Sequence, residues 1–412
     1  MKIGLFGLFG CGNSGNDASL EAMVLFLRRA CPDAELTCIC PAPDVVRQGL
    51  GVDAIASNPP IYGSRLGLAF DRVLLHIPRR VAGILHAFLL VRTFDIIIVP
   101  GTGFLDDFSD TPFGWPFGVL KWLGSAWLAR RKVLLVSIGA GPIRHWLSRF
   151  FMKAAARTAS YRSYRDKASK TFMTKLGIDT RADEVYPDIV FSLPVPKQEK
   201  REHDPLTIGV GVMSYFGWAP AGDADATIYR PYLRKLDEFI SWLLERGYNI
   251  RLLTGDGGDW KAIEDLKAEM IALHPDRVLS EERITAVRGS TLQDVMADIA
   301  RTDVTVVTRY HNLVCSLKLS RPVVSLEYST KNHALMADAG LDEFCQHVET
   351  FDVEALKAQF VWLIERRAEL TDRIAVHDVE LRRRLAVQED ILLDIIRGEA
   401  VRSRTQLQTA TN

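Results

Sequence analysis

An arginine, a histidine and a lysine follow two buried strands expected in the second half of the chain. Arg309 and His311 come directly after a β-branched run, and Tyr328 and Lys331 follow the next strand. A guanidinium offers a planar fork of donors to a carboxylate or phosphate, and an ammonium offers a point charge. A histidine in the first turn of a helix lies beside the positive end of the helix dipole. This pattern predicts an anion site and favours a functional role for His311, although Lys331 could also be a solvated surface lysine.

Glycine-bearing turns follow two expected strands in the first half of the chain. Gly101-Thr-Gly103 precedes Asp106 and Asp107, and Ser137-Ile-Gly-Ala-Gly-Pro142 ends the next strand. Glycines let a ligand approach the backbone, and α/β folds hold ligands at the carboxyl ends of their strands. Either aspartate could be a base, could accept a hydrogen bond from a sugar hydroxyl, or could simply be solvated.

Arg165 ends a strand-like alternation of aromatic residues and stands beside Asp166. Its guanidinium could clamp a carboxylate or phosphate, or could form a plain salt bridge with Asp166. Ser169 is placed to cap the helix that follows.

The first turn of the chain has the spacing of a dinucleotide-binding fingerprint, with Gly10, Gly12 and Gly15 between a strand and a helix. The carboxylate that should end the second strand is missing, which argues against a nicotinamide cofactor. Asn13 and Asp17 beside the helix N-terminus could instead bind hydroxyls or an anion. The alternative is a structural turn in which Asn16 or Asp17 caps the helix.

These residues are positioned by a repeated alternation of strand and helix, which predicts parallel sheets covered on both faces. The alternation covers both halves of the chain. The expected strands are residues 3–6, 35–40, 96–99, 133–137, 207–213, 249–254, 304–308 and 322–326, with helices at 17–30, 259–274 and from 310. We therefore expect an α/β fold with two Rossmann-like domains facing a cleft.

A polar, proline-broken stretch places the domain boundary. The domain scheme assigns the acceptor side to the first domain and the donor side to the second. It comprises a first domain over 1–193, a linker over 194–204, a second domain over 205–345, C-terminal helices over 350–399 that pack back on the first domain, and a flexible tail over 400–412.

The composition is that of an ordinary globular protein, with 48% apolar residues and 51 basic against 51 acidic residues. No global field therefore attracts nucleic acid or an anionic membrane, so any anionic ligand must be bound by local charge. The six cysteines lack the C-x-x-C pairs of a zinc site, so we expect no metal and a cytoplasmic protein. The apolar stretches 81–91 and 115–131 are too short to span a bilayer. They could lie in a membrane interface, although we favour core helices.

The order of these motifs resembles the polysaccharide pyruvyl transferase family. The resemblance covers about residues 10–341. It rests on Gly12-Asn-Ser-Gly-Asn-Asp17, Gly101-Thr-Gly103, Ser137-Ile-Gly-Ala-Gly-Pro142, Arg165-Asp-Lys-Ala-Ser169, Pro187-Asp188, Arg309-Tyr-His311 and Tyr328-Ser-Thr-Lys331. The first turn departs from the family pattern by one extra residue, Asn16. The resemblance implies a two-domain architecture similar to GT-B glycosyltransferases.

The resemblance also implies transfer of the enolpyruvyl unit of phosphoenolpyruvate, a co-substrate, onto two sugar hydroxyls as a cyclic ketal, with no cofactor. Arg165, Arg309 and Lys331 would bind its carboxylate and phosphate if the cleft closes. His311 would move protons, and Asp106 or Asp107 would orient the acceptor. Further substrate contacts are assigned to Asn13, Asp17, Gly103 and Tyr328.

The implied partner is a polysaccharide or lipid-linked glycan in exopolysaccharide or cell-surface glycan biosynthesis. Contact with the inner face of the membrane is then an option for a cytoplasmic enzyme. Two other hypotheses stay open at this point. One is a GT-B glycosyltransferase that uses a nucleotide sugar, and the other is a non-catalytic glycan-binding protein on the same fold.

Overall fold

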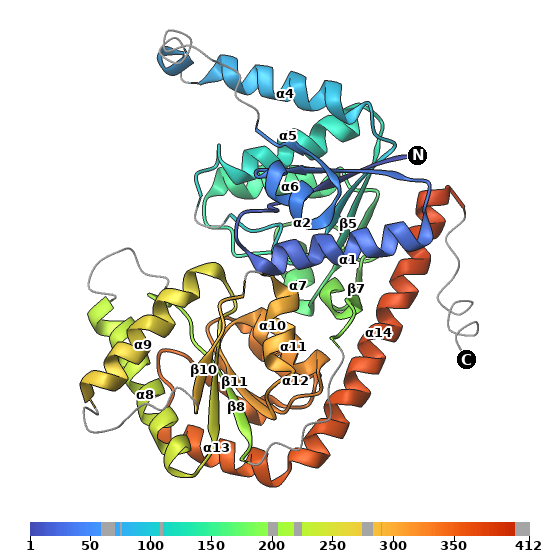
Figure 1. Ribbon diagram of the computed structural model, residues 1–412. Helices are drawn as coiled ribbons and strands as arrows, with labels where there is room; N and C mark the ends of the chain where they lie inside the picture. The colour runs from blue at the N-terminus through green and yellow to red at the C-terminus, as the bar shows by residue number, and fades with distance from the viewer. Residues whose placement is uncertain are drawn as a thin grey trace. The chain divides into compact units, whose positions relative to one another are not determined.

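The computed structural model describes residues 1–58, 71–74, 76–107, 110–196, 205–217, 225–273, 283–289 and 291–399. The chain divides into two compact units (Figure 1). The first contains Met1–Leu193 together with the chain from Arg383 onward, and the second contains Pro194–Arg382. Each unit is an α/β body built around one parallel sheet, as the alternation in the sequence predicts.

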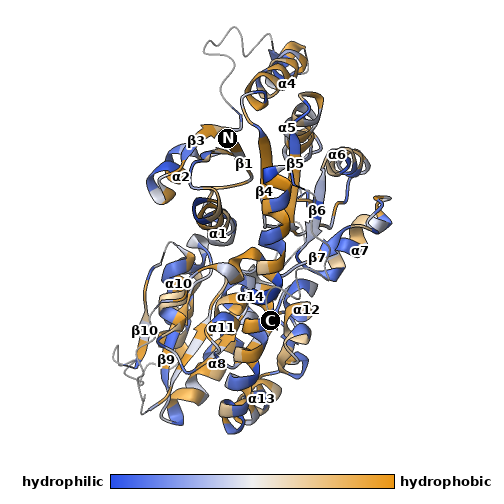
Figure 2. Ribbon diagram, turned by 90° about the vertical axis from the view of Figure 1, so that its right-hand side faces the viewer, coloured by the Kyte–Doolittle hydropathy of each residue, from blue (hydrophilic) through white to orange (hydrophobic). Residues whose placement is uncertain are grey.

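The sheet of the first unit has the strand order β3-β2-β1-β4-β5-β6-β7, and its strands pair in parallel. Central strand β4 is buried along its whole length and is among the most hydrophobic segments in Figure 2. A parallel strand is covered on both faces, so a continuous apolar run is its expected sequence. The strands are β1 (Lys2–Phe6), β2 (Glu35–Cys40), β3 (Asp53–Ala56), β4 (Ile96–Pro100), β5 (Lys132–Ile138), β6 (Tyr161–Tyr164) and β7 (Glu184–Val185).

Helices cover this sheet, and three of them form a row in which α4 packs on α5 and α5 packs on α6. The buried core between helices and strands includes Phe6, Phe104 and Trp122, whose rings contact one another. The helices are α1 (Ser14–Ala30), α2 (Pro43–Leu50), α4 (Ile77–Val91), α5 (Trp115–Leu128), α6 (Trp146–Arg157) and α7 (Lys167–Lys175), with a 3-10 turn at Ile189–Ser192.

The sheet of the second unit has the order β10-β9-β8-β11-β12-β13, again with parallel pairing. Its strands are β8 (Thr207–Gly211), β9 (Asn249–Leu253), β10 (Ile284–Ala286), β11 (Val304–Val307), β12 (Val323–Glu327) and β13 (Cys345–His347). Its helices are α8 (Arg230–Glu245), α9 (Trp260–Leu273), α10 (Leu292–Ile299), α11 (Tyr310–Lys318), α12 (Thr330–Asp338) and α13 (Val353–Glu365), with short helical turns at Asp225–Tyr229, Gly257–Asp259 and Asp342–Phe344.

The C-terminal helices are shared between the units. Helix α13 packs on α8 and β12 of the second unit, and α14 (Arg367–Arg397) contributes to both units. We expected the C-terminal helices to pack back on the first unit. Only the part of α14 from Arg383 onward belongs to that unit. The second unit therefore extends to Arg382, beyond the expected limit at residue 345. The tail expected at residues 400–412 lies outside the described residues.

Two features of the helices differ from the core-helix interpretation. Helix α5 does bury Trp122, but Trp127 at its end is 60% exposed. Helix α4 buries Ala87 and Val91 and exposes most of its other large apolar side chains. In the described part of the chain, no helix has the length and hydropathy that crossing a bilayer requires.

Candidate functional site

Arg309, which we predicted to bind an anion, is fixed at the edge of the second sheet by a buried carboxylate. It is the N-cap residue of α11, directly after β11. Its Nε donates to Oδ2 of Asp259 at 3.0 Å and its Nη2 donates to Oδ1 at 2.6 Å. The Asp259 side chain is fully buried, and that of Arg309 is 26% exposed. The pair fixes one edge of the guanidinium fork, while the side chain as a whole still reaches solvent.

Asp259 is held by its own loop as well as by Arg309. Its Oδ1 accepts from the backbone N–H of Ser214 at 3.1 Å, and its Oδ2 accepts from that of Gly255 at 3.2 Å. Burial alone would lower the pKa of Arg309, but the hydrogen bonds and the charge of Asp259 outweigh it and raise that pKa. Arg309 therefore stays a cation, aimed by a carboxylate that lies 50 residues earlier in the chain.

The loop after β9 leaves room for this pair only because residue 255 is glycine. A Cβ on Gly255 would lie 2.7 Å from Cβ and Cγ of Arg309 and 2.8 Å from Oδ1 of Asn312. Asn312 is fully buried in the first turn of α11, and its amide nitrogen and oxygen have no hydrogen-bond partner. Buried amides are normally satisfied, so this one marks the start of α11 as a place adapted to a polar ligand or water.

Asn332 links the start of α12 to the start of α11. Its Nδ2 donates to the carbonyl of Thr308 at 3.0 Å, and its Oδ1 lies 3.3 Å from the hydroxyl of Ser329. Lys331, half-buried, therefore occupies the first turn of a helix that is tied to the strand end beside Arg309. The structure brings together the two segments that carry the predicted cations of this unit.

His311 and Tyr328 lie in these same two segments. His311 is half-buried in the first turn of α11, with its ring perpendicular to that of Tyr310 at a centroid distance of 5.3 Å. Tyr328 follows β12 and lies 6.2 Å from the ring of Tyr215. Both stand at the carboxyl edge of the second sheet, as predicted.

In the first unit, Arg165 is tied to a different aspartate from the one its sequence neighbourhood offers. Its Nη1 donates to Oδ2 of Asp188 at 3.0 Å, whereas its Nε lies 3.8 Å from Asp166. The Arg165 side chain is 6% exposed and the Asp188 side chain is 1% exposed. Arg165 thus forms a salt bridge, as the alternative interpretation expected, but its principal partner is Asp188 and not Asp166. The sequence motif Pro187-Asp188 did not indicate this pairing.

Helix α7 begins in a way that differs from the expectation. Its cap is Asp166, whose Oδ1 accepts from the backbone N–H of Ser169 at 2.6 Å. The Ser169 hydroxyl instead accepts from the backbone N–H of Ala140 at 3.0 Å. Ser169 was therefore the wrong cap, and it fastens α7 to the turn after β5.

The turn after β5 passes close to Arg165 and to the turn after β4. A Cβ on Gly139 would lie 3.0 Å from Nε of Arg165 and 3.1 Å from Cα of Gly103. Gly103 and Gly139 thus let the two turns and the guanidinium pack together. The backbone N–H of Gly139 also donates to the carbonyl of Thr102 at 2.6 Å. Glycines line the carboxyl edge of the first sheet, as predicted. The Arg165 side chain fills part of the space that they leave.

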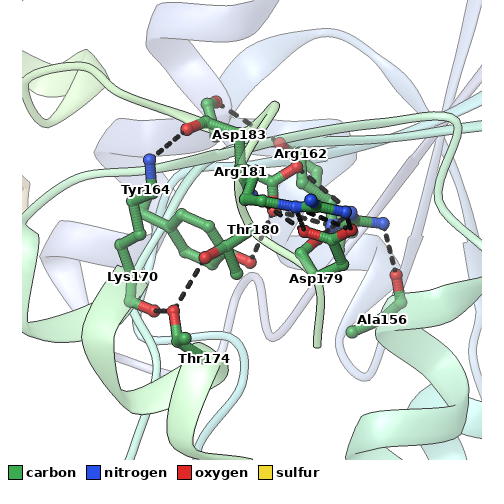
Figure 3. Close-up of polar contacts among 11 residues, drawn as sticks. Ala156, Arg162, Tyr164, Lys170, Thr174, Asp179, Thr180, Arg181 and Asp183 are labelled. Carbon is green, nitrogen blue, oxygen red and sulfur yellow. Dashed lines mark hydrogen bonds and ion pairs between the residues drawn. The ribbon is translucent and has the colours of Figure 1, made fainter. Parts of the chain in front are cut away.

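A network of hydrogen bonds holds β6, the strand that ends directly before Arg165 (Figure 3). Arg162 donates two hydrogen bonds to Asp183, at 2.9 and 3.1 Å, and one to the carbonyl of Asp179 at 3.1 Å. The hydroxyl of Tyr164 donates to the same Asp183 carboxylate at 3.1 Å. These bonds tie β6 to the segment before β7, which fixes the chain on both sides of the Arg165–Asp188 pair.

The two aspartates after β4 have different environments. Asp107 is 4% exposed, and its Oδ2 accepts from the backbone N–H of Arg144 at 2.7 Å. Asp106 is half-buried. Asp107 thus joins the turn after β4 to the start of α6, which leaves Asp106 as the more accessible carboxylate.

Asn13 and Asp17 hold the first turn of the chain. Asn13 is the N-cap of α1, accepting from the backbone N–H groups of Gly15 and Asn16 at 3.1 Å each, so Asn13 and not Asn16 or Asp17 is the cap. Asp17 Oδ1 accepts from the backbone N–H of Gly10 at 2.7 Å. Burial raises the pKa of Asp17, although the bond from Gly10 lowers it in part. Helix α1 accordingly begins at Ser14, three residues before the predicted start.

One group in the described residues could hold a metal ion. The ligand atoms of Glu327, His333 and Cys345 lie within 4.8 Å of one another, at β12, α12 and β13. Burial raises the pKa of the Cys345 thiol to about 12, so it is protonated at neutral pH unless an ion displaces the proton. The expectation of a metal-free protein stays a prediction.

Three residues that hold or adjoin Arg309 and Lys331 were not predicted from the sequence, namely Asp259, Asn312 and Asn332. A signal for the first was present, because Gly255-Asp-Gly-Gly-Asp259 is a glycine-rich turn directly after a strand. Asn312 and Asn332 directly follow His311 and Lys331 in the sequence. Arg165 lies in the first unit and Arg309 and Lys331 in the second, so each unit carries its own set of candidate residues.

Two Rossmann-like units, each built on a parallel sheet with candidate residues at its carboxyl edge, define a GT-B-like fold. The fold is similar to UDP-GlcNAc 2-epimerase from Methanocaldococcus jannaschii, with a TM-score of 0.56 and 12% identity over 88% of this chain and 92% of that one. It is also similar to a glycosyltransferase from Rickettsia africae, with a TM-score of 0.56 and 11% identity over 95% of this chain and 98% of that one. At these identities the likeness shows the fold alone.

The chain belongs to the polysaccharide pyruvyl transferase family, whose model matches residues 13–330. It is also 21% identical to the amylovoran biosynthesis protein AmsJ of Erwinia amylovora, over 98% of this chain and all of that protein. The family assignment makes the protein a transferase and confirms the resemblance identified from the sequence motifs.

Proposed function

We propose that this protein transfers the pyruvyl unit of phosphoenolpyruvate to two hydroxyls of one sugar in a polysaccharide or lipid-linked glycan precursor. The observation that carries the proposal is the cation set of the second unit. Arg309 is aimed by buried Asp259, and Asn332 ties its strand end to the helix that carries Lys331. A ligand with both a carboxylate and a phosphate suits two cations beside two helix N-termini.

His311 would supply the proton that starts the reaction. Protonation of the enol methylene carbon gives a methyl group and an oxocarbenium-like centre at the carbon that bears the phosphate. One sugar hydroxyl adds to this centre and loses its proton, and the second hydroxyl then displaces inorganic phosphate. The products are the cyclic ketal and phosphate, and each step requires a positioned acid or base.

The acceptor would lie at the sheet edge of the first unit. There the turn after β4 carries half-buried Asp106 close to Gly103, and we assign the acceptor-orienting role to Asp106 because Asp107 is committed to the Arg144 backbone. Asn13 and Asp17 would shape this edge by holding the first turn rather than by direct contact. Arg165 would add a fixed positive charge beside Gly103.

Calorimetric titration of the full chain with phosphoenolpyruvate tests the donor assignment. We expect saturable binding that weakens at least tenfold in Arg309→Lys and in Lys331→Ala. Arg309→Lys keeps a charge opposite Asp259 but loses the bidentate fork. Arg234→Ala is the matched control, because Arg234 is an exposed arginine on α8 that pairs with Glu269. Its affinity for phosphoenolpyruvate should equal that of the wild type.

Phosphate release over a panel of hexose glycosides tests the role of His311. We expect His311→Asn to bind phosphoenolpyruvate normally and to release no phosphate with any acceptor that supports the wild type. Wild-type release by this variant would exclude His311 as the proton donor. Heat from a nucleoside-diphosphate sugar, with none from phosphoenolpyruvate, would reassign the protein to glycosyl transfer, the function of the fold relative from Rickettsia africae.

A further inference from the structure

The helices that cover one side of the first unit carry an apolar surface that is exposed in the described part of the chain. Helix α4 exposes Ile77, Val81, Leu85 and Leu89, a set that recurs at helical spacing along one face. Its opposite face buries Ala87 and Val91 in the core. A helix that is apolar on two faces and buried on only one has a surface left for another partner. Figure 2 shows α4 beside α5 at the outer edge of this unit.

Aromatic residues extend this surface from α4 to α6. The guanidinium carbon of Arg80 lies 4.0 Å from the ring centroid of Phe113, and Phe113 contacts Phe151 at 5.8 Å. Phe150, next in the row, is 60% exposed, and Trp146 at the start of α6 is 72% exposed. We call the surface formed by Val81, Leu85, Leu89, Phe113, Trp146 and Phe150 the α4–α6 face.

The two chain segments that carry the α4–α6 face are basic. Residues 72–94 and 111–165 contain no aspartate or glutamate, although the chain averages 51 acidic residues in 412. The same two segments hold 14 lysines and arginines, of which Lys121, Arg162 and Arg165 are buried or paired within the unit. Exposed Arg149 stands on α6 between Trp146 and Phe150, and exposed Arg79 stands on α4, where its Nε lies 3.8 Å from buried Asp71. Exposed aromatic and aliphatic residues among cations are the pattern of a surface that lies on an anionic bilayer.

The α4–α6 face is attached to the candidate acceptor edge. The Nε1 of Trp115, at the start of α5, donates to the carbonyl of Phe104 at 3.1 Å. The backbone N–H of Arg144, two residues before Trp146, donates to Asp107 at 2.7 Å. In a parallel α/β unit the connecting helices run back against the strands, so their N-termini lie at the carboxyl edge of the sheet. Phe113, Trp146 and the turn after β4 therefore belong to one end of the unit.

We propose that the α4–α6 face docks the protein on an anionic membrane surface. The apolar side chains would enter the boundary between headgroups and acyl chains, and the arginines would contact lipid phosphates. Docking here would present the Asp106 edge to acceptors held at that surface. That consequence rests on the proposed function, whereas membrane binding itself does not.

Flotation of the full chain with vesicles tests the proposal. Vesicles of phosphatidylcholine with about one third phosphatidylglycerol should carry the protein, and phosphatidylcholine alone should carry at least tenfold less. The double variant Trp146→Ser, Phe150→Ser should lose binding at least tenfold. Val376→Ser, Val379→Ser is the matched control, because it removes two exposed apolar residues from α14 in the second unit. It should bind like the wild type.

Circular dichroism and phosphoenolpyruvate titration of the same variants separate docking from folding and from donor binding. If the double variant loses flotation but keeps its circular dichroism spectrum and its affinity for phosphoenolpyruvate, the proposal is supported. This conclusion holds even if no transferase activity is found. Equal flotation of wild type and double variant would overturn it. A wild-type dimer that dissociates in the double variant would also overturn it, because the face would then cover a second copy. Unchanged exposure of Trp146 to aqueous quenchers on vesicles would also overturn it, because the side chain would then not enter the boundary between headgroups and acyl chains.

Discussion

At the scale of single residues, the Arg309–Asp259 pair is an ion pair of the second unit whose carboxylate is fully buried. Asp259→Ala removes a fully buried carboxylate that accepts from Arg309 and from two backbone N–H groups. Breaking a buried ion pair leaves an uncompensated charge, which typically costs about 3–5 kcal/mol. We expect the free energy of unfolding to fall by about this amount, as measured by urea denaturation.

The matched control for Asp259 is an aspartate in an exposed ion pair. Asp179→Ala breaks the contact with Arg181, whose side chain is 91% exposed, so the urea midpoint should not move measurably. Asp259→Asn keeps the shape and should fall between wild type and Asp259→Ala. If Asp259→Ala and Asp179→Ala had equal midpoints, the buried pair would not stabilise the second unit.

A second residue-scale prediction concerns Lys121, a cation buried between α4 and α5. Burial lowers its pKa from 10.5 to about 8, and its Nζ donates to uncharged oxygens of Ser57 and Asn58, at 3.1 and 2.7 Å. Between about pH 8 and 10.5 the unfolded chain binds this proton and the folded chain releases it. The free energy of unfolding therefore rises with pH across this window through Lys121.

The measurement is the difference between wild type and Lys121→Met in urea denaturation at several pH values from 7 to 10.5. Other groups titrate equally in both proteins, so their contributions cancel. As the pH rises above 8, we expect the free energy of unfolding of the wild type to increase relative to that of the variant. A constant difference over this range would show that Lys121 keeps its ordinary pKa in the folded protein.

The positions of the candidate site residues could be predicted from the sequence, whereas the residues that pair with them could not. Arg309, His311 and Lys331 could be predicted because a cation after a buried strand has a single place in this fold class, the carboxyl edge of the sheet. Their partners could not, because Asp259 is 50 residues from Arg309 and pairs with it only once the sheet is formed. For Arg165 the sequence suggested the adjacent Asp166 as the partner. Asp166 instead caps α7, and Arg165 pairs with Asp188.

At the scale of secondary-structure elements, central strands were predictable and edge elements were not. Strands β4 and β11 are continuous β-branched runs, which the sequence shows directly. Strands β7 and β13 have two and three residues, and they form because a neighbouring strand offers its backbone. Helix α4 was favoured as a core helix from its composition, but composition does not tell which of two apolar faces is buried.

The second half of α14 illustrates how one polar residue can fix an element. Gln388 is 1% exposed, its Oε1 accepts from the hydroxyl of Ser137 at 3.0 Å, and its Nε2 donates to that of Ser163 at 2.8 Å. Gln388→Ala leaves buried hydroxyls without these partners, which typically costs about 1–3 kcal/mol for each unsatisfied group. We expect faster amide hydrogen exchange over the part of α14 from Arg383 onward.

Two comparisons test this role of Gln388. Arg383→Ala, on an exposed position of the same helix, should leave the exchange rates of α14 unchanged. Amides of α13, which packs in the second unit, should exchange alike in all three proteins. Uniform acceleration over both helices in Gln388→Ala would instead indicate global destabilisation, and it would contradict local anchoring.

At the scale of the whole molecule, α14 makes the stability of the first unit depend on the far end of the chain. Leu385, Leu392 and Ile396 are buried in the first unit, whereas Leu370, Ile374 and Leu381 belong to the second. A truncation ending at Arg382 removes only the first set. Burying one such side chain contributes about 1.5–3 kcal/mol, so the loss is comparable to the whole stability of an ordinary domain.

We therefore expect the truncation to act on one unit alone. In scanning calorimetry the transition of the first unit should move to lower temperature or disappear, while that of the second unit stays in place. A truncation ending at Glu399 keeps all of α14 and should leave both transitions unchanged. Because Arg309 and Lys331 lie in the second unit, the protein ending at Arg382 should still bind phosphoenolpyruvate while losing transfer. Loss of both transitions would mean that the two units unfold as one.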